Sequence, residues 1–287
     1  MTEEVLVARV APHYWEEPCI SGTAGSGTVF FSGCNLRCVY CQNHKIATGR
    51  MGQRMSVQEL SAAFLSLQEK GCHNINLVTP SHYIPQIREA LCLAKLTVPV
   101  VYNTSSYECV QSLRQMEGLV DIYLADLKYP DKGPAKKYSH AEDYPETAKA
   151  AIAEMVRQVG GITYAFEAEK KETGGTECRL VQNATEYPDG ALMKRGVIVR
   201  HLLLPGRTEE AKEVLRYLYE NYGDTVAVSI LNQYTPLPHV AAYPELNRKV
   251  TEEEYDEVVS YALDLGIGHG FLQEGQTADE SFIPEFK

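Results

Sequence analysis

The sequence predicts an α/β fold, a partial (β/α)6 barrel of the TIM type, and three observations support this fold class. Strand-like apolar runs alternate with amphipathic helix-like runs over most of the chain, as in a parallel sheet wound with helices. The 287 residues, 44% of them apolar, suffice for one large domain with a complete core. Polar residues follow the predicted strands, where wound α/β barrels place their active sites.

Six segments have the apolar, β-branched and aromatic composition of buried strands. The predicted strands lie near residues 28–32, 74–79, 98–103, 120–127, 197–204 and 225–231. Helices are predicted at residues 57–70, 84–95, 107–116, 146–159, 209–222 and 252–265. Two of these helices follow capping boxes, in which a hydroxyl and a carboxylate each satisfy a backbone amide. One box joins Ser56 to Glu59, and the other joins Thr251 to Glu254.

The remaining segments are expected to decorate a single domain. Residues 1–27, rich in Pro and Gly, form an N-terminal arm packed on the barrel. Residues 28–236 form the barrel core, with a small β-hairpin inserted near 161–195, where two weakly alternating runs flank a Thr-Gly-Gly-Thr turn. Residues 237–287 add a C-terminal helix and tail. No repeat or linker divides the sequence, which favours one domain over the whole chain.

Composition and charge exclude several classes of function. A formal net charge of −11 argues against sequence-independent binding of nucleic acid, which needs a basic stripe. No run has the apolar length of a transmembrane helix, and the acidic N-terminus lacks the pattern of a signal peptide. Without a secretion signal, the eight cysteines are expected to stay reduced. We therefore expect a cytoplasmic protein of an oxygen-poor cell that binds neither nucleic acid nor membrane.

Three cysteines on one short loop give the most specific chemical signal. Cys34, Cys38 and Cys41 follow the first predicted strand at spacing C-x3-C-x2-C. Cysteine thiolates hold iron–sulfur clusters, and a [4Fe–4S] cluster needs four ligands. Three thiolates therefore leave one iron open to a ligand that is not protein, which indicates chemistry at the cluster.

The cysteine loop closely resembles that of the radical S-adenosylmethionine (SAM) superfamily. Several runs are also similar to homologues of the pyruvate formate-lyase activating enzyme: GTVFFSGCNLRCVYCQN, VYNTSSYE, DIYLADLKY, VRHLLLPGR and LNQYTP. The resemblance covers roughly residues 12–286, and the cysteine loop is its most specific part. It implies that the three cysteines hold a [4Fe–4S] cluster and that SAM chelates the fourth iron through its amino and carboxylate groups.

The resemblance also implies an activity, that of a radical SAM oxidoreductase. One electron from flavodoxin or ferredoxin would pass through the cluster and cleave SAM reductively, releasing a 5′-deoxyadenosyl radical that abstracts hydrogen from a substrate. In the activating-enzyme branch that substrate is a glycyl radical enzyme. A peptide or a small molecule is the alternative, because the chain departs from the branch in its second-strand loop and in the insertion near 161–195. An enzyme that transfers a fragment of SAM without making a radical also stays open.

Asp126 and Lys128 are the main candidates for binding SAM. They lie two apart in an extended segment, so both side chains point to one face. An opposite-charge pair can bind both ends of a zwitterion, and the methionyl group of SAM is one. Activating enzymes use an aspartate and a lysine at this strand, which implies the same roles here. The alternative is an ion pair that only closes the barrel rim.

Five further residues are candidates for the cofactor site. Tyr40 lies between two cysteines, where the family often has an aromatic residue near adenine, and a packing role is equally open. Thr79 ends the second strand, where the Gly-Gly-Glu run of the family is missing, and Asn103 ends the third. Arg200 suits a carboxylate ligand. Gln233 follows the sixth strand, where some activating enzymes have a SAM-contacting histidine.

The other histidines and cysteines have structural interpretations. A lone strand histidine such as His201 is more often a hydrogen-bonded core group than a catalyst, and His82 is expected to begin the next helix. His44 raises an alternative in which it joins the three loop cysteines in a tetrahedral zinc site of a non-catalytic protein. Five cysteines are expected to pack as small apolar side chains: Cys19, Cys72, Cys92, Cys109 and Cys178. Of these, Cys19 lies in the N-terminal arm and is the one that can approach the site from there.

Overall fold

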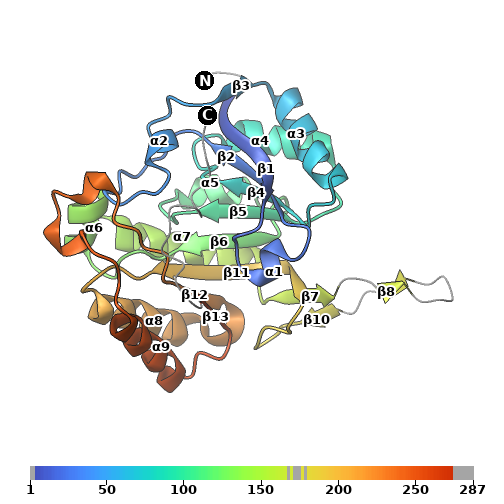
Figure 1. Ribbon diagram of the computed structural model, residues 1–287. Helices are drawn as coiled ribbons and strands as arrows, with labels where there is room; N and C mark the ends of the chain where they lie inside the picture. The colour runs from blue at the N-terminus through green and yellow to red at the C-terminus, as the bar shows by residue number, and fades with distance from the viewer. Residues whose placement is uncertain (1–3, 167–168, 171–175, 178–179, 274–287) are drawn as a thin grey trace.

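The computed structural model describes residues 4–166, 169–170, 176–177 and 180–273 and shows an open, twisted sheet wound with helices (Figure 1). Within these residues, the centre of the sheet is a parallel run in the order β2 (Ser26–Phe31), β4 (Ile75–Val78), β5 (Val100–Thr104), β6 (Ile122–Asp126), β11 (Ala191–Leu202), β12 (Ala227–Leu231) and β13 (Gly270–Leu272). In the described part of the chain the two ends of the sheet do not pair with each other. The predicted partial barrel is therefore confirmed.

The predicted helices and the inserted hairpin are present. The helices are α3 (Val57–Glu69), α4 (Ile84–Ala94), α5 (Val110–Arg114), α7 (Tyr144–Val159), α8 (Thr208–Tyr222) and α9 (Glu252–Leu265). Both capping boxes form. In the insertion, β7 (Thr163–Phe166) pairs antiparallel with β10 (Leu180–Gln182), and β8 (Glu169–Lys170) pairs antiparallel with β9 (Thr176–Glu177). No described helix combines the length and apolar character needed to cross a membrane.

Some elements differ from the sequence predictions, each for a local reason. Strand β11 begins earlier than predicted because its first half pairs antiparallel with β7. The N-terminal arm contains β1 (Val5–His13), which pairs antiparallel with β2 and with β3 (Gln53–Met55), so it extends the sheet rather than only packing on it. Helix α6 (Lys132–Ser139) was not predicted, because Gly133 and Pro134 in its first turn are typical of a loop.

Successive strand residues face two different cores, because side chains alternate across a sheet. On β6, Tyr123 packs with the helices, whereas Ile122 faces the inside of the barrel. There it meets Ile20 of the short helix α1 (Pro18–Ser21), which closes the barrel interior. Asp126 continues the inward series at the carboxyl end of β6. The inward face of the sheet is therefore apolar at one end and polar at the other.

Tyr144 fixes the ends of two neighbouring strands. Its side chain is fully buried at the start of α7. Its hydroxyl lies 2.9 Å from the carbonyl oxygens of Ser105 and Asp126. The same oxygen accepts the backbone amide of Lys128 at 3.0 Å. One buried side chain thus holds together the segments that follow β5 and β6.

His201 of β11 is a hydrogen-bonded core histidine. It is 3% exposed, and its Nδ1 lies 2.7 Å from the carbonyl oxygen of Leu127, to which it donates. Burial lowers the pKa of His201 to about 4, from an ordinary value of 6.5. The imidazole therefore stays neutral at physiological pH.

We expect Tyr144→Phe to lower the free energy of unfolding by about 1–3 kcal/mol, because it deprives buried backbone groups of their hydroxyl partner. Tyr107→Phe is the matched control, since that hydroxyl bonds Asp143 at an exposed position. Its expected effect is within about 0.5 kcal/mol. Urea denaturation of both variants measures the difference. Equal stabilities would show that the hydrogen bonds of the Tyr144 hydroxyl to the backbone do not stabilise the fold.

The stability of the apoprotein is expected to fall in acid partly through His201. Because its folded pKa of about 4 lies below 6.5, the stabilisation is present above pH 6.5 and is lost as pH falls toward 4. Between pH 7 and pH 5 the unfolding free energy should therefore drop by about 2 kcal/mol more in the wild type than in His201→Gln. Urea titrations at the two pH values test this, and equal drops would show that His201 does not titrate as its burial requires.

Candidate active site

A cavity of about 250 Å³ opens at the carboxyl ends of the parallel strands. Its wall includes every residue proposed from the sequence as a ligand of the cluster or of SAM: Cys34, Cys38, Tyr40, Cys41, Thr79, Asn103, Asp126, Lys128, Arg200 and Gln233. These residues come from the ends of successive strands and from the cysteine loop. The fold therefore brings all ten together, and their roles in binding stay predictions.

The C-terminal end of α6 anchors the cysteine loop. The amide of Val39 donates to the carbonyl oxygen of Tyr138 at 2.8 Å. The amide of Arg37 donates to the carbonyl oxygen of Ser139 at 3.4 Å. The last carbonyls of a helix lack partners within the helix, so the loop supplies them. Backbone contacts thus hold the loop and leave its thiols free to bind another group.

The three thiols fit the donor set of a [4Fe–4S] cluster. All three are partly buried and form no disulfide. The Leu36 amide lies 3.4 Å from Sγ of Cys34, in the manner of the hydrogen bonds that surround cluster sulfurs. Burial raises the pKa of Cys41 to about 12 and also raises that of Cys34. Their thiolates therefore need a cation beside them, which iron supplies.

The alternative zinc site is not assembled. Among the described residues, no three His, Cys, Asp or Glu side chains converge on a single metal position. His44 is exposed, and its ring lies against that of His239, with centroids 4.5 Å apart. A [4Fe–4S] cluster makes a different demand, because each cysteine binds a separate iron and the sulfurs need not meet at one point.

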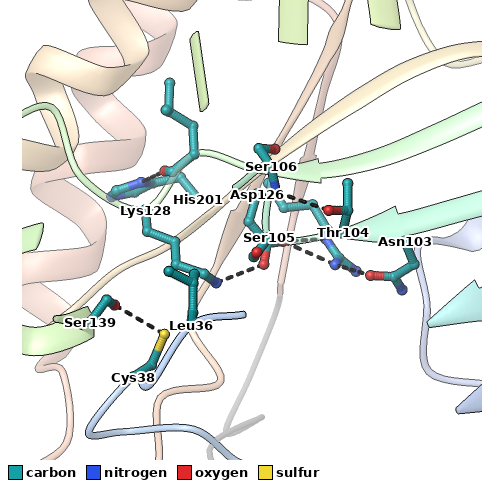
Figure 2. Close-up of polar contacts among 12 residues, drawn as sticks. Leu36, Cys38, Asn103, Thr104, Ser105, Ser106, Asp126, Lys128, Ser139 and His201 are labelled. Carbon is teal, nitrogen blue, oxygen red and sulfur yellow. Dashed lines mark hydrogen bonds and ion pairs between the residues drawn. The ribbon is translucent and has the colours of Figure 1, made fainter. Parts of the chain in front are cut away.

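Charged side chains that line the cavity pair with one another (Figure 2). Nζ of Lys128 lies 2.7 Å from Asp126, and the Arg200 guanidinium lies 3.0 Å from the same carboxylate. Arg200 also donates to Asn103 Oδ1 at 2.6 Å. Burial opposes the charged form of Asp126, but the two cations outweigh it and hold the pKa of this carboxyl below its usual value. Asp126 and Lys128 thus present both charges that a zwitterion needs.

Glu16 is a candidate that the sequence analysis missed. Its carboxylate accepts hydrogen bonds from the side-chain amides of Asn76 and Asn103, at 3.0 and 3.1 Å. It also lies 3.1 Å from Arg200, and its side chain is 10% exposed on the cavity wall. The available signal was a pair of adjacent carboxylates, Glu16 and Glu17, before a proline. Nothing local indicates that the first of them reaches strand ends far along the chain.

Thr79 has a strained backbone at the cavity wall. Its φ is 58°, in the left-handed region that a β-branched residue rarely adopts. Its amide donates to the carbonyl oxygen of Asn103 at 2.9 Å, which holds the turn after β4. Such strain concentrates at functional sites. Thr79 occupies the position where the resemblance expects a glycine-rich run.

Tyr40 and Gln233 line the cavity but are tied to neighbours. The Tyr40 hydroxyl lies 2.7 Å from the hydroxyl of Tyr129, and the side chain is 5% exposed. Oε1 of Gln233 accepts from the Gln273 amide at 3.3 Å, and its backbone carbonyl accepts from Gln42 at 3.0 Å. Gln42 belongs to the cysteine loop, so Gln233 links that loop to the last strands of the sheet.

Two structural expectations need correction. His82 does not begin a helix, because α4 starts at Ile84, and its Nε2 lies 2.8 Å from the carbonyl oxygen of Ser32. Cys19 and Cys72 are buried as predicted, whereas Cys92 and Cys109 are exposed. Cys92 lies off the apolar face of α4, and Cys109 precedes α5. Cys178 lies outside the described residues.

Comparison with known proteins supports the resemblance read from the sequence. A family model described as the Radical SAM superfamily matches residues 28–166. The uncharacterized protein MJ0674 of Methanocaldococcus jannaschii is 25% identical over 253 residues, which cover 84% of this chain. The chain spans 64% of the length of that curated relative.

Solved structures with the same fold include SuiB of Streptococcus suis bound to S-adenosylmethionine, with a TM-score of 0.53, 12% identity, and coverage of 85% of this chain and 48% of that one. Methylornithine synthase (PylB) has a TM-score of 0.52 and 12% identity, over 91% of this chain and 77% of that one. The radical SAM superfamily uses a [4Fe–4S] cluster and SAM, the two cofactors that the cysteine loop and its resemblance predict. The family model matches the part of the chain that contains the cysteine loop and the Asp126–Lys128 pair, and the solved structures share the fold of the chain.

Proposed function

We propose that this chain is a radical SAM enzyme in which Cys34, Cys38 and Cys41 hold a [4Fe–4S] cluster. The observation that carries the proposal is that the three-cysteine loop and the Asp126–Lys128 pair line one cavity. After one-electron reduction, the bound cluster and SAM would supply a 5′-deoxyadenosyl radical that abstracts hydrogen from a substrate.

Polar side chains around the cavity bind SAM, and apolar side chains exclude water from it. Asp126 and Lys128 bind the amino and carboxylate ends of the methionyl group, and Arg200 holds Asp126 in place from behind. Tyr40, Thr79, Asn103 and Gln233 complete the SAM site. The apolar part of the wall keeps water from the reacting centre and includes Phe30, Phe31, Leu36, Ile46, Val78, Leu202 and Leu231.

A protein or peptide segment is the substrate that we favour, including the glycine loop of a glycyl radical enzyme. Trp15 is 61% exposed and lines the cavity, and the adjacent Tyr14 is 54% exposed. Aromatic side chains at a cavity mouth suit the docking of a polypeptide. SuiB, described with its precursor peptide SuiA and similar in fold at a TM-score of 0.53, supports this substrate class. A small molecule is the second candidate, supported by the fold shared with methylornithine synthase.

An acidic one-electron carrier such as flavodoxin or ferredoxin is the reductant that we propose. Residues 18–58 contain no Asp or Glu, although the whole chain has a net charge of −11. Lys45 and Arg50 are exposed on and after α2 (His44–Ala47), which continues the cysteine loop. The Ile46 carbonyl accepts the amide of Gly33 at 2.8 Å, so this basic segment folds back beside the loop. Complementary charge steers partners of opposite sign.

The proposed activity predicts 5′-deoxyadenosine from SAM after anaerobic reconstitution with iron and sulfide and reduction with dithionite. Cys38→Ala should abolish the product, because the cluster loses one of its three protein ligands. Cys92→Ala, at an exposed position outside the loop, is the matched control and should retain it. Chromatography of the nucleosides gives the answer. Methylthioadenosine or S-adenosylhomocysteine in its place would indicate transfer of a SAM fragment, and absence of bound iron would favour a non-catalytic protein.

The proposed carrier surface predicts that Lys45→Glu combined with Arg50→Glu slows cluster reduction by reduced flavodoxin roughly tenfold or more at low ionic strength. The effect should shrink as salt screens the charges. Dithionite should reduce the variant cluster normally, because a small reductant needs no docking surface. Lys70→Glu with Arg216→Glu, exposed just after α3 and on α8, changes the net charge equally and should leave the rate unchanged. Stopped-flow absorbance measures all rates, and equal slowing by both pairs would contradict this surface.

A further inference from the structure

Three buried hydroxyls form a chain that ends on one of the cluster cysteines. Oγ of Ser139 lies 3.0 Å from Sγ of Cys38, a contact drawn in Figure 2. The hydroxyl of Tyr129 lies 2.7 Å from Oγ of Ser139, and that of Tyr40 lies 2.7 Å from that of Tyr129. Ser139, Tyr129 and Tyr40 are 1%, 0% and 5% exposed. The hydroxyl chain therefore runs through the protein interior.

The direction of the hydrogen bonds follows from counting protons. A cysteine thiolate bound to iron has no proton, so Ser139 must donate its single proton to Cys38. The Ser139 oxygen then accepts from Tyr129, and the Tyr129 oxygen accepts from Tyr40. Burial raises the pKa of Tyr129 and Tyr40 well above the ordinary value, so both keep their protons. All three hydrogen bonds therefore point toward the sulfur, and each polarises the next.

This donor distinguishes Cys38 from Cys34. The sulfur of Cys34 has the backbone amide of Leu36 as its donor, at 3.4 Å. Cys38 has a side-chain hydroxyl at 3.0 Å, placed by the same turn of α6 whose carbonyls anchor the loop. A side-chain donor can be removed by substitution while the backbone contacts remain.

We propose that the chain Tyr40–Tyr129–Ser139 raises the reduction potential of the cluster through its hydrogen bond to Cys38, with Ser139 as the positioning residue. The inference rests on the proposed function, because it requires the cluster to be present. Reduction adds negative charge that is shared with the ligand sulfurs. A hydroxyl donating to one of them stabilises the reduced form more than the oxidised form. The hydroxyl chain thus makes the cluster easier to reduce by an electron carrier that is only a weak reductant.

The experiment is a redox titration of the anaerobically reconstituted protein, followed by the electron paramagnetic resonance signal of the reduced cluster. Ser139→Ala should lower the midpoint potential, so that the ratio of reduced to oxidised cluster at the wild-type midpoint falls up to tenfold, or about 59 mV for one electron. Ser139→Thr should restore it. Tyr129→Phe should give a smaller shift in the same direction, because Ser139 still donates but is no longer polarised.

Tyr138→Phe is the matched control, since it removes a hydroxyl from the adjacent residue of α6. That hydroxyl bonds Glu245 and Arg207 and does not belong to the chain. An unchanged midpoint in Ser139→Ala with normal iron content, or an equal shift in Tyr138→Phe, would overturn the inference alone. If Ser139→Ala fails to hold the cluster, Tyr129→Phe decides in the same way. A wild-type protein that binds no cluster would overturn the proposed function and this inference together.

Discussion

The arrangement of the candidate site depends on the buried guanidinium of Arg200. Its charge is paired with Asp126 on a neighbouring strand and with Glu16 on the N-terminal arm, and its Nη2 also donates to Asn103. Charges removed from water are tolerated when they are paired and hydrogen bonded, and removing one partner is costly. Arg200 therefore dictates where Asp126 lies, and Asp126 in turn places Lys128 at 2.7 Å. Charge pairing joins segments that are far apart in the sequence.

A second constraint acts on the cysteine loop, and it is carried by the backbone. The free carbonyls at the end of α6 accept amides of the loop, which fixes the loop without using its thiols. Charged side chains of the candidate site are thus held by ion pairs, whereas the candidate metal ligands are presented by main-chain contacts. Tyr144 adds main-chain support to the ion-paired residues, because its hydroxyl contacts the backbone of both Asp126 and Lys128. The cavity is preorganised from both sides.

Local patterns in the sequence predicted six parallel strands (β2, β4, β5, β6, β11 and β12), the main helices and ten residues of the cavity wall. Strand ends in a parallel sheet meet at one edge, so the polar residues that follow predicted strands were expected together. Strand β1 and helix α6 were missed, because the arm is rich in Pro and Gly and the first turn of α6 contains Gly133 and Pro134. Glu16 and Ser139 were missed because their roles come from contacts with distant segments. No local periodicity encodes such contacts.

Two members of the hydroxyl chain lie apart from the candidate SAM ligands Asp126 and Lys128, whereas the third, Tyr40, lines the cavity. Tyr129 and Ser139 approach Cys38 from the side of α6, and they are absent from the described cavity wall on which Asp126 and Lys128 lie. Two demands oppose each other at a cluster of this kind, because a high potential favours reduction by a carrier and a low potential favours cleavage of SAM. A donor behind the sulfur changes this balance without altering the cavity. Substitution at Ser139 or Tyr129 would therefore change the potential of the proposed cluster while the candidate SAM-binding residues stay in place.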